Sequence, residues 1–421
     1  MPAEGGRRKK SNDIIRQANE LKVLARRHSS KSDDTFKVGV EIEICLLDSR
    51  GAPVDAKPAI ERLRKYHDID YEYGRCQLEY KTEPVYFESL ARLHSQFEEF
   101  TEHLDMVVQK VYRKQVIPVF LGANPSPLIL QDGLITQKPR YRKLARWQGA
   151  LPDVEIDGAK IKALYAATAI QGFHLHLQGR NPDFTAQMFN HILNLIPAVI
   201  LLGANSRLFA GRVYSIHEPR IYLYDQTEQQ NSGFPGIPKY LSGIEDYIDY
   251  IISRKPVIAK NYFEMVKERH DDARVRLNTG AYRVETRVMS VQPTPKTMMA
   301  MIEFFVGYLH RAIHEGRELR PLASVREERQ AVVRSGFHAK THFDVIKTVR
   351  NHLAFARKGL ADLGTKPDFL SILERRLDTR NTAGEYVAKL WLSRYDGSAE
   401  TTVGEVIADI WEKTRKNTPI S

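Results

Sequence analysis

Two glutamates stand two positions apart in the segment "VGVEIEICLLD" (38–48) of this 421-residue chain. Glu41 and Glu43 alternate there with apolar residues, which is the pattern of a half-buried strand. Because alternate residues of a strand share a face, the two carboxylates are neighbours and repel each other unless a cation lies between them. The spacing therefore raises the hypothesis of a metal site.

Three further segments show the same alternation of apolar and charged residues. Their polar faces carry Gln77, Glu79, Lys81 and Glu83 in "CQLEYKTEPVY", His174, His176 and Gln178 in "GFHLHLQ", and Arg283, Glu285 and Arg287 in "AYRVETRV". A surface strand usually carries Thr, Ser, Lys and Gln in mixed order instead. If the four segments pair in one sheet, their polar faces form a single charged basin.

Such a basin would have a definite chemistry. Clustered carboxylate oxygens are the ligands that Mg²⁺ or Mn²⁺ prefers, and a bound metal removes the repulsion between Glu41 and Glu43. Arginines in the same place grip phosphate oxygens and stabilise the charge that develops during phosphoryl transfer. Metals and arginines around a phosphate predict an enzyme that uses a nucleotide.

Each pattern alone also has a structural interpretation. A pair of glutamates on a strand is often a solvated face, a His-x-His pair is often structural, and "RVETR" fits a ladder of surface ion pairs. The chain has no P-loop, no dinucleotide-binding glycine fingerprint and no set of kinase motifs. An ATP-using protein with this sequence would therefore hold the nucleotide through metals on a sheet.

Composition narrows the class of protein. Apolar residues make up 42% and charged residues 27%, and the formal net charge of +11 favours anionic partners. Two cysteines, Cys45 and Cys76, exclude a disulfide scaffold and fit a reducing cytoplasm. The longest apolar run (192–205) is too short to span a bilayer and contains Pro197, so we expect a buried helix and no membrane. The N-terminal residues lack the apolar part of a signal peptide.

The order of elements predicts an α+β fold. We expect a basic N-terminal arm (1–33), then a single catalytic domain (34–421) with a sheet-containing core (34–320) and a helical C-terminal part (321–421). The predicted strands are 36–48, 76–86, 115–120, 172–178, a short extended run at 220–225, and 281–288, and the main predicted helices are 59–67, 90–114, 186–206 and 296–317. The loop 226–238 has the composition of a lid, although a disordered surface loop is an equal alternative.

Six segments in this order resemble the bacterial and plant-type glutamate–cysteine ligases and their carboxylate–amine ligase relatives. They are "VGVEIEICLLD", "QLEYKTEP", "GANPSP" followed by "PRYRKL", "GFHLHL", "LGANSRLFAGR" and "RVETRV". The resemblance implies a catalytic domain similar to that of glutamine synthetase, with a curved, largely antiparallel sheet and helices packed outside it. It also implies ATP, Mg²⁺ (or Mn²⁺), and an amide formed from a carboxylate and an amine through an acyl phosphate.

The resemblance further implies roles for individual residues. The implied metal ligands are Glu41, Glu43, Glu79, Glu83 and Glu285, and the implied nucleotide-binding residues are His174, His176, Arg283 and Arg287. Arg287 would meet the transferred phosphate, with Glu285 and Glu41 as its catalytic companions. The implied substrate-binding residues are Arg140, Tyr141, Asn205, Ser206 and Arg212.

Three positions depart from the family pattern. Lys81 stands where a neutral or acidic residue is expected, "GANPSP" replaces a turn that usually contains histidine, and Arg207 stands where proline is typical. The last two concern the expected substrate pocket, so the substrate is left open. Arg207 and the net charge suggest an acid more anionic than glutamate.

Three functions are therefore weighed. The first is a ligase of small-molecule acids and amines, with glutamate and cysteine as the default pair. The second is a metal-dependent kinase of a small acid on the same sheet. The third is a nucleic-acid-associated protein that binds through its basic arm, and a homo-oligomer is compatible with all three.

Overall fold

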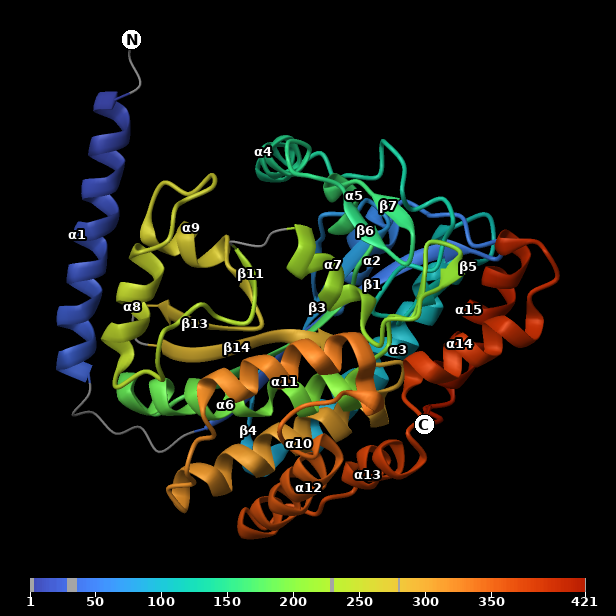
Figure 1. Cartoon of the computed structure of the whole chain (residues 1–421). Coiled ribbons are helices and arrows are strands. Elements are labelled where there is room, and N and C mark those ends of the chain that lie inside the picture. Colours follow the sequence, from blue (N-terminus) through green and yellow to red (C-terminus); the bar gives the residue numbers. More distant parts are fainter. Residues whose placement is uncertain (1–3, 29–35, 228–230, 279–280, 421) are drawn as a thin grey trace.

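An eight-stranded sheet positions the charged segments in the computed structural model, which describes residues 4–28, 36–227, 231–278 and 281–420 (Figure 1). The strands of this sheet are β1 (Lys37–Asp48), β2 (Asp68–Tyr71), β3 (Gln77–Lys81), β4 (Val85–Tyr86), β5 (Val116–Val119), β8 (Gly172–Gln178), β13 (Ala273–Asn278) and β14 (Ala281–Ser290). Neighbouring strands follow the order β13-β14-β8-β1-β3-β2, and β4 and β5 also pair with β1. All the pairings in this sheet are antiparallel.

The registers place the charged residues opposite one another. Glu41 on β1 is paired with His174 on β8, and Glu43 is paired with Glu79 on β3. Glu285 on β14 is paired with His176. A register shift between Thr286 and Met289 interrupts the β14–β8 ladder just where Arg287 stands. The four segments singled out in the sequence therefore meet in one sheet.

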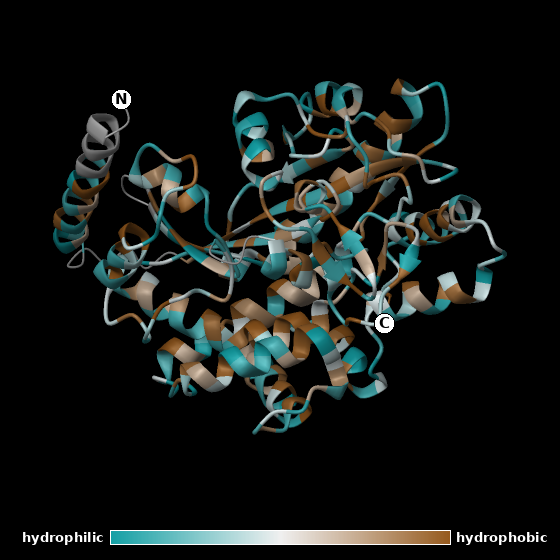
Figure 2. Cartoon of the chain, turned by 45° about the horizontal axis from the view of Figure 1, so that its top comes forward, coloured by the Kyte–Doolittle hydropathy of each residue, from teal (hydrophilic) through white to brown (hydrophobic). Residues whose placement is uncertain are grey.

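Helices cover the apolar face of this sheet and form the main core (Figures 1 and 2). They are α3 (Ala91–Val111), α6 (Pro182–Gly203), α10 (Pro295–His314), α11 (Leu322–Ser335), α12 (Val345–Asp362) and α13 (Leu370–Thr379). The predicted buried helix is α6, which packs on β14 and β13 and contains Pro197. Among the helices of the described residues, only α6 is long and apolar enough to cross a bilayer, and 94% of its most apolar stretch is buried inside the protein.

Two glycines allow α10 and α12 to pack closely. A Cβ atom on Gly307 would lie 2.2 Å from the carbonyl oxygen of Ala356, and one on Gly359 would lie 1.9 Å from the carbonyl oxygen of Gly307. The backbones of the two helices thus touch, and any larger residue at either position would separate them.

The remaining elements surround the sheet. The helices are α1 (Glu4–His28), α2 (Lys57–Leu63), α4 (Pro139–Gln148), α5 (Ala163–Ala166), α7 (Pro219–Thr227), α8 (Ile244–Ile252), α9 (Tyr262–Lys267), α14 (Ala383–Arg394) and α15 (Ala399–Arg415), with 3₁₀ turns at Phe87–Ser89 and Gly336–His338. Three two-stranded pairs complete the fold: β6 (Val154–Ile156) with β7 (Ala159–Ile161), β9 (Leu208–Phe209) with β10 (Arg212–Val213), and the parallel pair β11 (Ser232–Gly233) with β12 (His270–Asp271).

The predicted basic arm is largely one helix. Residues 4–28 form α1, which packs against α8 and α9, and Ile14, Ala18 and Ala25 are buried. Arg26 donates two hydrogen bonds to Glu245, at 2.6 and 2.8 Å. Residues 29–33 of the predicted arm lie outside the described residues.

One predicted element is wrong. The segment 220–225 is predicted to be a short extended run, yet it lies within helix α7. Pro219 occupies the first position of this helix, where its missing N–H costs nothing. A segment of six residues is too short for its apolar spacing to distinguish a strand from a turn and a half of helix. The proline just before it indicates the start of a helix more reliably.

Candidate active site

A cavity of about 330 Å³ opens on the face of the sheet opposite the large helices. Its charged walls come from β1, β3, β13, β14, α4, the C-terminal end of α9 and the segment after β2. They are Glu41, Glu43, Glu72, Glu79, Lys81, Arg140, Lys267, Glu268, Arg274, Arg276 and Arg287. Tyr141, Trp147 and Tyr224 are among its aromatic walls. The cavity is therefore the charged basin expected from the strand patterns.

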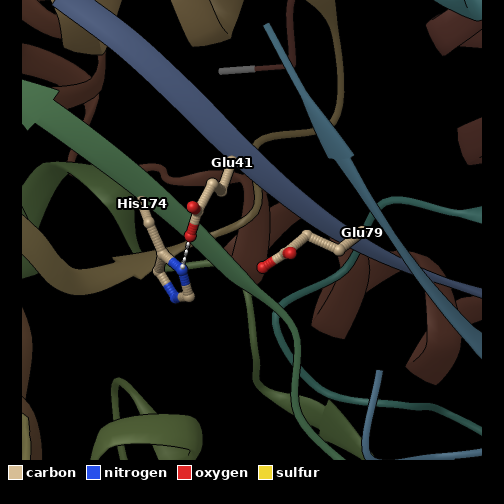
Figure 3. Close-up of side chains that lie close together, drawn as sticks. All are labelled: Glu41, Glu79 and His174. Carbon is tan, nitrogen blue, oxygen red and sulfur yellow. Dashed lines mark ion pairs between the residues drawn. The ribbon is translucent and has the colours of Figure 1, made fainter. Parts of the chain in front are cut away.

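Glu41 lies between two histidines. Its carboxylate oxygens are 3.5 Å from Nδ1 of His174 and 3.2 Å from Nε2 of His176, and Glu79 lies on the other side of Glu41 (Figure 3). Burial alone would raise the pKa of Glu41, but the two imidazoles lower it below its usual value. Burial, assisted by Arg287, lowers the pKa of His174, so its imidazole is neutral and its nitrogens are available as ligands.

Glu43, Glu72 and Glu79 form a second acidic group. Glu43 accepts a hydrogen bond from the N–H of Gly172 at 2.5 Å, and Lys81 lies 3.2 Å from Glu79. Burial and then the charge of Glu43 raise the pKa of Glu72 to about 8, and burial followed by the charges of Glu72 and Glu41 raises that of Glu79. Glu72 and Glu79 therefore hold protons at neutral pH, because they are buried and lie beside other carboxylates.

Glu285 orients the arginines at the other end of the basin. It is fully buried and accepts two hydrogen bonds from Arg274, at 2.8 and 2.7 Å, and one from Arg287 at 2.5 Å. Burial opposes ionisation of Glu285, but these arginines hold its pKa well below the usual range. The pKa of Arg287 is raised because the attraction of Glu285 outweighs burial. Both groups are therefore charged, and the Arg287 guanidinium is fixed at the edge of the cavity.

The donor set fits divalent metals. Three groups of side chains have ligand atoms within 4.8 Å of one another: Glu41 with Glu79 and His174, Glu41 with His176 and Glu285, and Glu43 with Glu72 and Glu79. Nδ1 of His176 is buried without a hydrogen-bond partner among the described residues, and Nε2 of His174 lies 3.6 Å from a carboxylate oxygen of Glu43. Oxygen-rich clusters suit Mg²⁺ or Mn²⁺, and a cation there would remove the repulsion that raises the pKa values of Glu72 and Glu79.

The structure brings most of the predicted site residues together. Glu41, Glu43, Glu79, Arg140, Tyr141 and Arg287 line the cavity, and Glu285, His174 and His176 contact those lining residues. Their roles in binding and catalysis stay predictions.

The other five predicted site residues do not line this cavity. Glu83 follows the end of β3, is exposed, and bonds through its backbone to Gln96. Arg283 lies further along β14 and is opposite Gln178. Asn205 and Ser206 are buried where they support the backbone, since Asn205 donates to the carbonyls of Phe120 and Val291, and Ser206 accepts from the N–H of Arg220. Arg212 is exposed and stacks on Tyr214.

Glu72, Arg274 and Arg276 are among the charged residues of the basin that were not singled out in the sequence. Glu72 follows "DIDY" at the same spacing of two that led to Glu41 and Glu43, and Arg274 and Arg276 alternate with apolar residues in "ARVRLN". The same pattern would have found them. Their segments are short, and the alternation in a strand of four to six residues is weak when read alone.

The predicted lid is partly described. Residues 228–230 lie outside the described residues, while Asn231 lines the cavity and accepts a hydrogen bond from Arg269 at 2.6 Å. Ser232 and Gly233 form β11, which pairs with β12. Closure over the cavity stays a prediction.

Comparison with known proteins gives one family and a set of related folds. The model of the glutamate–cysteine ligase family 2 (GCS2) matches residues 37–406. A predicted glutamate–cysteine ligase 2-1 from Rhodococcus jostii is 23% identical over 224 residues, which is 52% of this chain and 53% of that protein. A similar protein from Nocardia farcinica is 25% identical over 42% of each chain. The chain thus matches only about half the length of these curated relatives.

Two solved structures share the fold. A bifunctional glutathione synthetase from Pasteurella multocida superposes with a TM-score of 0.63 and 16% identity, over 95% of this chain and 54% of that one. A glutamate–cysteine ligase from Francisella tularensis in complex with AMP gives a TM-score of 0.62 and 12% identity, over 92% and 90% of the two chains. The predicted fold, a largely antiparallel sheet flanked by helices, is confirmed.

Proposed function

Because this chain belongs to glutamate–cysteine ligase family 2, we propose that it is an ATP-dependent ligase that joins a carboxylic acid to an amine. One observation carries the proposal: Glu41, Glu79 and Glu285, from three separate strands, converge with two histidines on one cavity that Arg287 also lines. Acidic clusters beside a fixed arginine suit the binding of a metal-bound triphosphate.

The metal ligands in this proposal are Glu41, Glu43, Glu72, Glu79 and Glu285, with His174 and His176 as nitrogen donors. Mg²⁺ or Mn²⁺ held there would neutralise the phosphate oxygens of ATP. Arg287 stabilises the charge that spreads over the transferring phosphoryl group, and Glu285 keeps its guanidinium in one orientation. The guanidinium of Arg287 is therefore already oriented before the reaction starts, so little free energy is needed to reorient it in the transition state.

The proposed reaction has two steps. In the first, a carboxylate oxygen of the acid attacks the γ-phosphorus of ATP, an O–P bond forms, the bond to the bridging oxygen breaks, and ADP leaves. In the second, the amine nitrogen attacks the carbonyl carbon of the acyl phosphate, the C–N bond forms, and the C–O bond to the phosphoryl group breaks. Of the two protons that the ammonium group loses, one leaves with the phosphate and one goes to solvent.

The acid is proposed to be glutamate or a more anionic relative. Lys81, Arg140, Lys267 and Arg276 add positive charge to the cavity, in excess of what the phosphate-binding Arg287 supplies. A second carboxylate on the acid would find a partner among these side chains. Arg207, which first suggested an acidic substrate, instead pairs with Glu385 at 2.6 Å and does not line the cavity.

The test is an assay of purified protein with ATP, Mg²⁺, and a panel of acids and amines. Phosphate release that depends on the amine, with an amide product identified by mass spectrometry, supports ligation. Release with the acid alone, with a stable phosphorylated product, supports the kinase alternative. We expect Glu41→Ala and Glu285→Ala to abolish turnover, whereas Glu83→Ala, which alters an exposed residue outside the cavity, retains it. Full activity in both of the first two variants would contradict the proposal.

A further inference from the structure

Two more cavities continue outward from the candidate active site. The second has a volume of about 720 Å³ and shares Trp147, Asn231 and Val257 with the first. The third has a volume of about 340 Å³ and shares Tyr222 and Gln226, both on α7, with the second. Shared walls place the three cavities next to one another, in a path that leads from the metal-binding carboxylates to α11.

The middle cavity carries polar groups on its walls together with a patch of apolar and aromatic groups. The apolar and aromatic groups come from the end of α4, the chain before the β6–β7 hairpin, and the segment after α8: Trp147, Leu151, Pro152, Val154, Pro256 and Val257. The charged side chains on its walls, Asp153, Glu155 and Lys255, belong to exposed residues. A space of this size is typical of pockets that hold a drug-sized ligand, and cysteine, with seven non-hydrogen atoms, would leave most of it to water.

The outer cavity is cationic. Arg326 and Arg334 lie two turns apart on one face of α11, and each lies over an aromatic ring, Arg326 over Phe234 at 5.3 Å and Arg334 over Tyr222 at 5.0 Å. Neither has a carboxylate partner within ion-pair distance among the described residues; Arg326 donates to the carbonyls of Pro235 and Ile237. The aromatic rings position both guanidiniums, and their remaining N–H groups can donate hydrogen bonds to a ligand.

The carboxylate of the outer cavity is already neutralised. Asp225 pairs with Arg329, which also donates two hydrogen bonds to Asp272, at 2.8 and 2.9 Å. Arg329 is 2% exposed, and its donors are used by these two aspartates. Because Arg326, Arg329 and Arg334 outnumber Asp225 and Asp272, the far end of the path keeps a net positive charge.

We infer that the acceptor amine is one end of an elongated molecule with an apolar middle and a carboxylate at its far end, as in a short acidic peptide. This inference rests on the proposed ligase function. The amino group would lie at the metal-binding basin, the apolar part would fill the middle cavity, and the carboxylate would bind Arg326 and Arg334. The middle and outer cavities thereby select for a larger acceptor than cysteine.

The experiment compares three acceptors in the presence of ATP, Mg²⁺ and glutamate. They are cysteine, the peptide alanyl-phenylalanyl-aspartate, and its neutral analogue alanyl-phenylalanyl-asparagine amide. We expect the acidic peptide to have the lowest KM. In Arg326→Ala/Arg334→Ala its KM should rise about tenfold or more while the KM of the neutral peptide stays the same, because only charge-assisted hydrogen bonds to the carboxylates are lost.

The matched control, Arg350→Ala/Arg357→Ala, also removes two arginines, from the surface of α12, where they pair with Asp378 and Glu374. It should keep the preference for the acidic peptide. Equal KM values for the two peptides in the unaltered protein would overturn the inference, and so would turnover of cysteine without turnover of either peptide. Absence of phosphate release with all three acceptors would instead overturn the proposed ligase function on which the inference rests.

Discussion

The half-buried Glu41 and the fully buried Glu285 are ionised, while Glu72 and Glu79 hold protons in the same basin. The difference follows from their partners. Imidazoles lie beside Glu41 and arginines beside Glu285, whereas Glu72 and Glu79 lie mainly beside other carboxylates. A carboxylate away from water is ionised only where hydrogen-bond donors or positive groups stabilise its charge. A divalent cation should therefore bind most favourably at the end of the basin that contains Glu72 and Glu79, where carboxylates outnumber positive groups.

Glu72→Gln should weaken metal binding. The substitution keeps the shape of the side chain but removes a charged ligand from the group with Glu43 and Glu79, so the dissociation constant for Mn²⁺ should rise about tenfold or more. Electron paramagnetic resonance of free Mn²⁺ measures this directly. Glu83→Gln is the matched control, since Glu83 is exposed and outside the cavity. Equal Mn²⁺ affinities in the two variants would exclude Glu72 as a ligand.

His352 should make the fold sensitive to acid. Burial, with help from Arg320 and Arg317, lowers its pKa from 6.5 to about 3, so the unfolded chain binds the proton more tightly than the folded protein does. Above pH 6.5 His352 is neutral in both states and does not reduce the free energy of unfolding. As the pH falls from 6.5 toward 3, the unfolded chain takes up the proton first and the free energy of unfolding decreases.

The check is the pH dependence of urea unfolding. Over this range His352→Leu should reduce the slope of stability against pH by up to about 1.4 kcal/mol per pH unit. Parallel curves for the variant and the unaltered protein would show that His352 titrates normally in the fold.

At the scale of elements, strands were easier to predict than the short connecting helices. β1, β8 and β14 show a period of two over seven or more residues, and each has its predicted faces in the structure. Helices α3, α6 and α10 were predicted from their apolar spacing and lie within a few residues of the expected bounds. The helix α7 and the β6–β7 hairpin were missed because segments of three to nine residues contain too few repeats to decide a period.

A single buried arginine ties three elements together. Arg376 on α13 is fully buried and donates to the carbonyl of Leu202 on α6, to the side chain of Gln292 at the end of the sheet, and to the carbonyl of Ile420. Burial lowers its pKa to about 10, so the guanidinium is still charged at neutral pH.

Arg376→Met should therefore lower the free energy of unfolding by about 3 kcal/mol or more, because it leaves several buried acceptors without donors. Urea denaturation followed by circular dichroism measures the change. Arg375→Met, next to it on the same helix and exposed, is the control and should have a much smaller effect. Equal losses in the two variants would show that the hydrogen bonds of Arg376 contribute little.

At the scale of the whole molecule, the sheet gathers residues that are more than 200 positions apart in the chain, such as Glu41 and Glu285. Their convergence could be predicted because four strands carried charge on one face and apolar residues on the other. The substrate pocket could not be predicted in the same way. Asn205 and Ser206 match the family pattern in sequence, yet their side chains satisfy buried backbone groups. The packing of loops and helices decides which polar residues line a cavity, and the periodicity of the sequence does not predict that packing.

The middle and outer cavities can also be recognised only from the structure of the whole molecule. Their walls come from α4, α7, α11 and the segment after α8, which are far apart in sequence. Arg326 and Arg334 look like ordinary surface residues of an amphipathic helix when the sequence is read alone. Only the arrangement of α11 beside α7 shows that they lie at the end of a path to the metal-binding carboxylates.

The most direct test follows an oxygen atom. If the acid is activated as an acyl phosphate in the basin, one carboxylate oxygen of the acid must leave with the phosphate. Glutamate labelled with oxygen-18 in its carboxylates, incubated with the protein, ATP, Mg²⁺ and an accepted amine, should give inorganic phosphate that carries one labelled oxygen in its mass spectrum. Phosphate released together with the amide but without the label would contradict the account.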